Sequence, residues 1–234
     1  MNILAVDTSG PVAGVAVLRS GEVAYEGAAV NKMTHSVNLM PMIEEALGRA
    51  GLDVSEIDLY ACVTGPGSFT GVRIGAAAAK GFAWGREIPC YGISTLEAMA
   101  HSLGIYQGYI CPVMDARRAQ VYNALFYVNH GEITRVAPDR AIALADLGEE
   151  IKNLTEPVFL VGDGSNLCYN TLLKDVPNLV LPSEHRMHQR AVGVALLAAT
   201  QAAQGIAPTG AELTPNYLRL SQAEREKLER ENKK

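Results

Sequence analysis

The expected strands and helices occur twice in the same order along the chain. The first half opens with two apolar strands, at residues 2–6 and 12–18, on either side of a short polar turn. Apolar runs joined by a turn rich in glycine and proline are typical of a β-hairpin. A third strand at 22–29 extends this hairpin. Helices are expected at 34–50, which Gly51 closes, and at 70–84. The remaining elements of this half are strands at 59–63 and 90–93 and a helix at 96–101.

After Gly104 the same order begins again. A strand at 109–115 pairs with a hairpin partner at 120–127, and residues 132–136 extend that sheet. A helix at 144–151, a strand at 158–161 and a long helix at 191–204 follow. The repeat predicts a duplicated α/β fold with an N-terminal lobe at 1–103 and a degenerate C-terminal lobe at 104–234. The charged tail at 221–234 is typical of a solvated helix, which either returns to the first lobe or stays free.

The first hairpin turn contains Asp7, Thr8 and Ser9. A turn with hydroxyl groups and free backbone amides can hold a phosphate, and an aspartate there can hold a hydrated metal ion. The same residues also suit a turn in which the side chains hydrogen-bond their own backbone and simply close the hairpin. Spacing alone favours the second interpretation.

The most distinctive run is Gly-Pro-Gly-Ser-Phe-Thr-Gly-Val-Arg-Ile-Gly at 65–75. It follows a buried strand and opens a helix, so it presents amides where anions bind well. It lacks the Gly-Lys-Ser/Thr of a P-loop, and by itself it is weak evidence for a phosphate site.

The helix that follows carries a stripe of small residues, Gly71, Gly75 and Ala79. Each interior glycine costs a helix roughly 1 kcal/mol relative to alanine. Close approach of another backbone would compensate for this cost, either from the chain's own sheet or from a partner. If the contact is intermolecular, replacing Gly75 with leucine abolishes pairing and leaves the monomer folded.

The first helix is apolar around most of its girth, which indicates either full burial or an interface. Its methionines favour an adaptable contact surface. Both helices together predict a partner surface. Its residues are His35, Leu39, Met40, Met42, Ile43, Leu47, Gly71, Ile74, Gly75, Ala78 and Ala79.

Composition excludes several classes of function. The net charge is −5, with no lysine or arginine cluster outside the tail, which argues against unaided RNA binding. His185 and His188 lie three apart in a polar segment without cysteines, so no metal site is predicted. The four cysteines lie in apolar stretches without a CxxC pair and fit a reducing, cytoplasmic compartment. No apolar run reaches the roughly 18 residues that cross a membrane.

Five segments, taken together, resemble the TsaB family, also called YeaZ. They are residues 3–9, 65–75, 115–122, 161–164 and 215–219, and the resemblance covers essentially the whole chain. It implies the two-lobed, ribonuclease H-like fold of actin, hexokinase and the Hsp70 ATPase, within the glycoprotease-like group that contains TsaD. It also implies pairing with TsaD, which TsaE joins, to transfer a threonylcarbamoyl group to the adenosine beside the anticodon of tRNA.

The chain departs from TsaD where TsaD binds its metal. Thr95 and Met99 stand where TsaD has the two histidines of an HxxxH pair, and neither replaces an imidazole ligand. The second-lobe turn that starts at Asp115 has no glycine to cradle a phosphate. Its Arg117 and Arg118 are instead expected to contact an anion or a partner carboxylate. By the resemblance, a vestigial nucleotide site remains, made of Asp7, Thr8, Ser9, Gly162 and Gly164.

These departures favour a non-catalytic subunit that binds no cofactor itself, with ATP and a metal on its partners. We expect a homodimer in isolation, a heterodimer with TsaD, and contact with tRNA only through the complex. One alternative is a metalloprotease-like or ATP-using enzyme of the same fold. Another is a stand-alone RNA-binding module, which the acidic balance disfavours.

Overall fold

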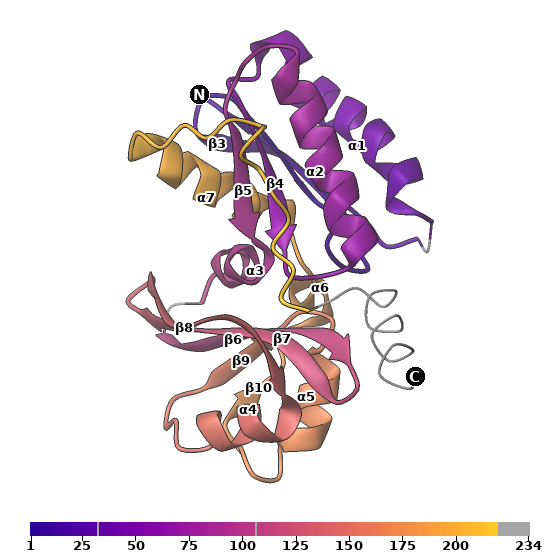
Figure 1. The fold of residues 1–234 in the computed structure, drawn as a ribbon. Coiled ribbons are helices and arrows are strands. Elements are labelled where there is room, and N and C mark those ends of the chain that lie inside the picture. Colours follow the sequence, from indigo (N-terminus) through magenta and orange to yellow (C-terminus); the bar gives the residue numbers. More distant parts are fainter. Residues whose placement is uncertain (32, 106, 220–234) are drawn as a thin grey trace, which may run out of the picture.

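The computed structural model describes residues 1–31, 33–105 and 107–219. It has two lobes, each built on a five-stranded sheet, with helix α3 (Thr95–Leu103) lying between them (Figure 1). Among the described residues, no helix combines the length and the apolar character that crossing a bilayer requires.

The sheet of lobe one has the order β3-β2-β1-β4-β5. Strand β1 pairs antiparallel with β2 and parallel with β4, so the hairpin turn and the end of β4 lie at the same edge. The strands are β1 (Ile3–Asp7), β2 (Ala13–Arg19), β3 (Glu22–Ala29), β4 (Leu59–Gly65) and β5 (Cys90–Ser94).

Helices cover both faces of this sheet. Helices α1 (His35–Ala50) and α2 (Phe69–Trp84) pack on one face, where Val6, Ile43 and Ala79 share a core. Helix α7 (Ala191–Ala203) packs on the other face. A short 3₁₀ helix, η1 (Val54–Glu56), precedes β4.

Lobe two repeats this topology with the order β10-β9-β6-β7-β8. Its first strand again pairs antiparallel with a hairpin partner and parallel with the next strand. The duplicated α/β fold is therefore confirmed. The elements are β6 (Gln107–Arg117), β7 (Gln120–Asn129), β8 (Glu132–Ala143), α4 (Leu144–Ile151), β9 (Val158–Val161), α5 (Ser165–Leu172), β10 (Leu179–Val180) and α6 (Glu184–Met187).

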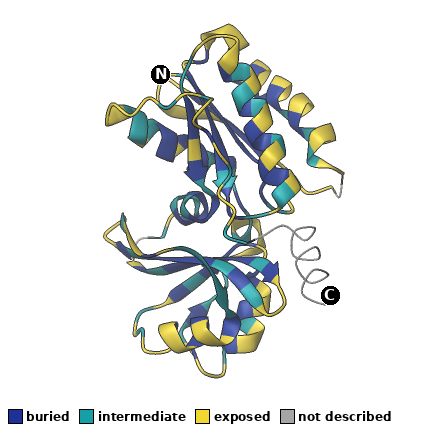
Figure 2. Cartoon of the chain, in the orientation of Figure 1, coloured by how far each residue is buried: buried dark blue, intermediate teal, exposed yellow. Residues whose placement is uncertain are grey.

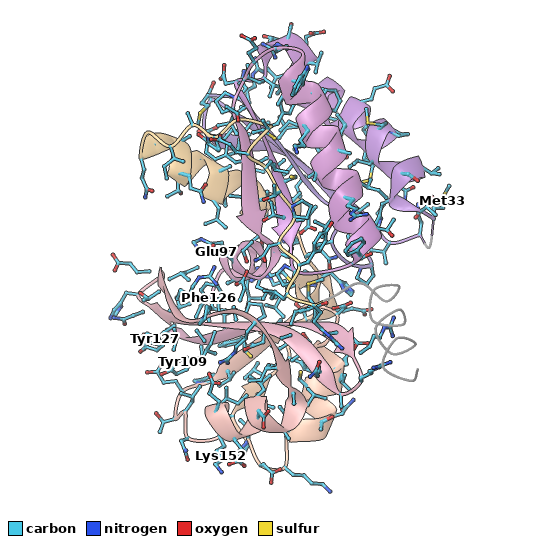
Figure 3. The ribbon with its side chains drawn as sticks, viewed as in Figure 1. Met33, Glu97, Tyr109, Phe126, Tyr127 and Lys152 are labelled. Atoms are coloured by element: carbon cyan, nitrogen blue, oxygen red, sulfur yellow. The ribbon has the colours of Figure 1, made fainter. Side chains whose placement is uncertain are left out.

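Helix α3 joins the lobes through an apolar core and a polar cluster. Its Leu96 and Met99 pack with Phe126 and other residues of lobe two. Beside this core, Arg135 of β8 donates to Glu97 of α3 at 2.8 Å and lies over the Phe126 ring, 4.7 Å from its centre. Figure 3 shows Glu97 and Phe126 near the junction of the two lobes.

The chain returns to lobe one after completing lobe two. Helix α7 packs on β1, β2 and β4, and Leu213 lies in the core beneath α1 and α2. The predicted C-terminal lobe at 104–234 therefore needs correction, because helix α7 and Leu213 pack on lobe one. The tail at 221–234 lies outside the described residues.

Candidate functional site

A cleft of about 460 Å³ lies between the lobes. Five segments distant in sequence form its walls. They are the β1–β2 turn (9–11), the start of α2 with the loop before it (66–69), the β6–β7 hairpin (114–117 and Tyr122), Asp163 after β9, and the C-terminal segment (216–219).

The hairpin turn of lobe one hydrogen-bonds to itself and to the start of α2. Asp7 Oδ1 accepts from the Ser9 amide at 2.9 Å and from the Ser9 hydroxyl at 2.6 Å. The Thr8 hydroxyl donates to the Gly71 carbonyl at 2.7 Å, and the Ser68 amide donates to the Ser9 carbonyl at 2.6 Å. All three predicted residues of the turn are buried, and of these only Ser9 lines the cleft. The backbone amides of Ser9 and Ser68, which would suit a phosphate, are thus already hydrogen-bonded within the chain.

Asp7 is the unusual group of this turn. Its Oδ2 atom is buried without a hydrogen-bond partner. Burial raises the pKa of its carboxyl group, and the bonds from Ser9 and the nearby charge of His35 oppose this only in part. A buried carboxyl with one unpaired oxygen is costly in its charged form.

Gly162 and Gly164 allow close packing against strand β6 and do not line the cleft. A Cβ at Gly162 would lie 2.2 Å from the Val113 carbonyl oxygen, and one at Gly164 would lie 3.1 Å from it. Neither glycine lines the cleft, but Asp163 between them does. Its Oδ1 accepts from the Asp115 amide at 3.2 Å, and burial raises its pKa. Sequence reasoning missed Asp163, although its position between two glycines at a strand end was a usable signal.

The β6–β7 turn adopts an unusual backbone without glycine. Arg117, Arg118 and Ala119 have φ angles of 66°, 56° and 55°, in the left-handed region that side chains disfavour. Arg117 lines the cleft and pairs with Asp115 at 3.3 Å. Arg118 follows in the same turn and is not part of the cleft lining.

The C-terminal segment ties the cleft walls together. The Asn216 amide donates to the Thr64 carbonyl at 2.7 Å, and the Tyr217 ring stacks on Phe69 with 4.3 Å between ring centres. Arg73 donates to the Tyr217 hydroxyl at 2.7 Å, and Arg219 donates to the Ala116 carbonyl of lobe two. Residues 215–219 belong to one of the segments that resemble the TsaB family, but nothing in the sequence indicates that residues 216–219 line the cleft.

The predicted partner surface is largely a core. Leu39 and Ile43 are each 2% exposed, and Leu47, Gly71, Gly75 and Ala79 are also buried within the lobe. A Cβ at Gly71 would lie 2.0 Å from the Thr8 carbonyl oxygen, and one at Gly75 would lie 2.7 Å from the Thr8 hydroxyl. The close approach that explains these glycines is therefore to the end of strand β1 and to Thr8 just after it. These six residues do not reach the surface, and a leucine at Gly75 would disrupt the lobe itself.

The outer sides of α1 and α2 carry other apolar residues. Of the predicted residues, Met40 is 49% exposed, whereas His35, Met42, Ile74 and Ala78 are partly buried. The sequence prediction omitted Val37, 53% exposed, and Trp84, 77% exposed. We define the helix face as Met33, Val37, Met40, Ala77, Gly81 and Trp84. On α2, Ala77, Gly81 and Trp84 are spaced i, i+4, i+7, so they lie along one side. On α1, Val37 and Met40 are spaced i, i+3, and Met33 lies in the loop just before this helix. Figure 2 shows the exposed outer sides of both helices, and Figure 3 places Met33 where the chain enters α1.

Positions 95 and 99 hold no metal ligands. Thr95 and Met99 are buried beside the interlobe core, and Met99 packs toward Gly162. Within the described part of the chain, no group of three or more histidine, cysteine, aspartate or glutamate residues is arranged to hold a metal ion.

Comparison with known sequences identifies related proteins. The family described as "TsaD: tRNA N6-adenosine threonylcarbamoyltransferase" matches residues 29–227. The tRNA threonylcarbamoyladenosine biosynthesis protein TsaB of Bacillus subtilis is 34% identical over 231 residues, covering 98% of this chain and 99% of the relative. The protein of the same name from Haemophilus influenzae is 40% identical over 124 residues, covering 52% of each chain.

Solved structures support the fold. YeaZ from Pseudomonas aeruginosa superposes with a TM-score of 0.75 at 24% identity, covering 93% of this chain and 99% of that one. The ROK hexokinase from Thermus thermophilus superposes with a TM-score of 0.50 at 12% identity, covering 88% of this chain and 100% of that one. The expected two-lobed, hexokinase-like fold is thereby confirmed.

Proposed function

This chain belongs to the TsaB family of tRNA threonylcarbamoyladenosine biosynthesis proteins, and from that premise we propose that it is the non-catalytic subunit that pairs with TsaD. The pair then binds TsaE and transfers the threonylcarbamoyl group to the adenosine beside the anticodon of tRNA.

The observation that carries the pairing is the helix face. Its large apolar side chains are about half exposed or more, and Ala77 and Gly81 between them leave room for a second helix to approach closely. A Cβ at Gly81 would meet nothing within 4 Å, so this glycine is not explained by packing inside the lobe. Full burial of one large apolar side chain contributes roughly 1.5–3 kcal/mol, so a few such residues can support a stable pair.

Two observations support a role outside catalysis. Thr95 and Met99 supply no imidazole for a metal, and the β6–β7 turn places two arginines where a glycine cradle would accept a phosphate. The metal and ATP of the reaction are therefore assigned to the partner subunits. Arg117, at the mouth of the cleft, is left to contact an anion or a carboxylate of a partner.

The same helix face serves a homodimer in isolation. Two copies would bury the same residues that TsaD would cover, so the homodimer and the heterodimer exclude each other. With a net charge of −5, the chain reaches tRNA through the complex rather than by itself.

The pairing is tested with a matched pair of variants. Ala77→Glu places a carboxylate in the helix face, whereas Ala203→Glu places one at the exposed end of α7, on the other side of the sheet. Burying an unpaired charge at an interface is costly, so Ala77→Glu is expected to weaken binding to TsaD at least about tenfold. Ala203→Glu is expected to bind normally. Size-exclusion chromatography with light scattering measures both, alone and mixed with the TsaD of the same organism.

Equal binding of TsaD by both variants would exclude the helix face as the interface. The non-catalytic assignment has a separate test, in which the purified chain is assayed for bound zinc or iron and for magnesium-dependent ATP turnover. Bound metal or ATP turnover would favour the alternative that this chain is itself an enzyme.

A further inference from the structure

The ring of His35 points into the lobe rather than toward a partner. His35 is the first residue of α1 and is partly buried. Its Nε2 atom lies 2.7 Å from the carbonyl oxygen of Gly10. A carbonyl oxygen only accepts, so Nε2 carries the hydrogen and donates it. This bond joins the start of α1 to the β1–β2 turn.

Gly10 lies where three parts of the molecule meet. With Ser9 and Pro11 it forms one wall of the interlobe cleft. On its other side, Gln189 packs so closely that a Cβ at Gly10 would lie 1.9 Å from the amide nitrogen of its side chain. Gln189 is buried in the linker that carries the chain from lobe two back to α7. His35 therefore links α1 to a backbone position that contacts both the cleft and the linker between the lobes.

The first turn of α1 has little other support from the lobe. Thr34 occupies the N-cap position without a side-chain cap bond, and the first buried residue of the helix is Leu39. Asn31 and Asn38 bond to each other through their side-chain amides, but this exposed pair ties the preceding loop to the helix itself. His35 is thus the side chain through which the first turn bonds to the hairpin turn of the sheet.

We propose that His35 is a positioning residue that holds the start of α1, and with it Met33, Val37 and Met40, against the wall of the interlobe cleft. The inference rests on the proposed function only for what the helix face binds. Its structural part concerns this chain alone. Its consequence is that displacement of the cleft wall and displacement of the apolar half of α1 are coupled, because one hydrogen bond joins them.

The structural part is tested by amide hydrogen exchange on the full chain without a partner. His35→Ala is expected to speed exchange roughly tenfold at the Val37 amide, which bonds to Thr34, and at the Ser9 amide, which bonds to Asp7. Helix α2 and lobe two should exchange as in the unmodified chain, which shows that the fold is intact. His35→Gln keeps a donor that can reach Gly10 and should restore protection. Ser36→Ala, the exposed neighbour, is the matched control and should change neither amide.

Unchanged exchange at both amides in His35→Ala would overturn the inference, as would equal loss in His35→Ala and His35→Gln. Titration with TsaD then separates the two proposals. His35→Ala should bind TsaD about three- to tenfold more weakly than His35→Gln or Ser36→Ala, because the bond no longer fixes the helix face. If TsaD fails to bind even the unmodified chain, the proposed function falls, while the exchange result still decides the role of His35.

Discussion

The two lobes share one sheet topology but differ in the helices built on it. In lobe one, the helices that follow the third and fourth strands, α1 and α2, have 16 residues each. Their counterparts in lobe two, α4 and α5, have 8 residues each. The longer pair carries Val37, Met40 and Trp84 on its outer side, whereas the large apolar residue exposed on the described α4 and α5 is Leu167. The apolar surface is therefore a feature of α1 and α2 themselves and not of the topology that the two lobes share.

The first hairpin turn also differs between the two lobes. In lobe one, the turn after Asp7 is buried beneath the loop at Gly67, where a Cβ would lie 2.4 Å from the Ser9 carbonyl oxygen. In lobe two, the turn after Asp115 reaches the cleft through Arg117, whose backbone is in the left-handed region. One copy has closed its turn with its own backbone, and the other has filled it with large charged side chains. Neither resembles an open phosphate cradle.

The largest expected effect comes from the glycine that brings α2 onto β1. Gly71→Ala places a Cβ 2.0 Å from the Thr8 carbonyl oxygen, and this backbone atom cannot rotate away as a side chain could. We expect a loss of about 3 kcal/mol or more in the free energy of unfolding. Gly81→Ala, on the same helix with open space around it, is expected to stabilise the chain by up to about 1 kcal/mol. Urea unfolding measures both, and a similar effect of the two would contradict the packing described for α2.

A smaller effect is expected where the lobes are joined. Arg135→Ala removes the bonds to Glu97 at 2.8 Å and to Asp139 at 2.6 Å, together with the contact over Phe126. We expect a loss of about 1–2 kcal/mol, since these partly buried pairs share one guanidinium group.

Arg49→Ala is the control for this loss. It removes an exposed pair with Glu45 at 3.8 Å and should cost less than about 0.5 kcal/mol. If the unfolding curves of the two variants coincide, the polar cluster at α3 contributes nothing specific to the joining of the lobes.

The smallest expected effect concerns the buried aspartate of lobe one. Burial raises the pKa of Asp7 above its ordinary value of 3.8, so the folded chain holds this proton more tightly than the unfolded chain does. The resulting stabilisation is complete below 3.8 and is lost as the pH rises through the raised pKa. Asp7→Asn cannot ionise, and we expect it to be more stable at neutral pH by about 1 kcal/mol.

The pH dependence distinguishes this cause from others. The advantage of Asp7→Asn should shrink as the pH is lowered from 7 toward 4, which a series of urea unfolding curves measures. An advantage that stays constant with pH would mean that ionisation of Asp7 is not its source. Asp115→Asn, in the turn of lobe two, loses a pair with Arg117 and should bring no gain.

Most strands and long helices were predictable, because their apolar patterns are local. The elements that sequence reasoning missed are short ones that depend on distant partners. Strand β10 has two residues and exists through its pairing with β9. Helix α5 begins with polar residues after Gly164, and its helical pattern is weak until Cys168 and Leu172 are seen to be buried. The 3₁₀ helix at 54–56 did have a local signal, the capping box of Asp53 and Glu56.

The site was harder to predict than the fold, because periodicity reveals the sides of a helix without revealing what each side meets. Helix α2 has small residues on two sides, Gly71 and Gly75 toward β1 and Ala77 and Gly81 toward solvent. The sequence favours neither as the interface. The meeting of Tyr217 with Phe69 joins residues far apart in the chain, and no local pattern predicts it.

The return of α7 to lobe one has a consequence for the order in which the protein is made. Ribosomes release the chain from its first residue onward, so the part of the sheet face that α7 covers stays open until about residue 203 has emerged. Lobe two has all of its strands between residues 107 and 180, without interruption. We expect the later lobe to close first during synthesis. The lobe that begins the chain is then completed last.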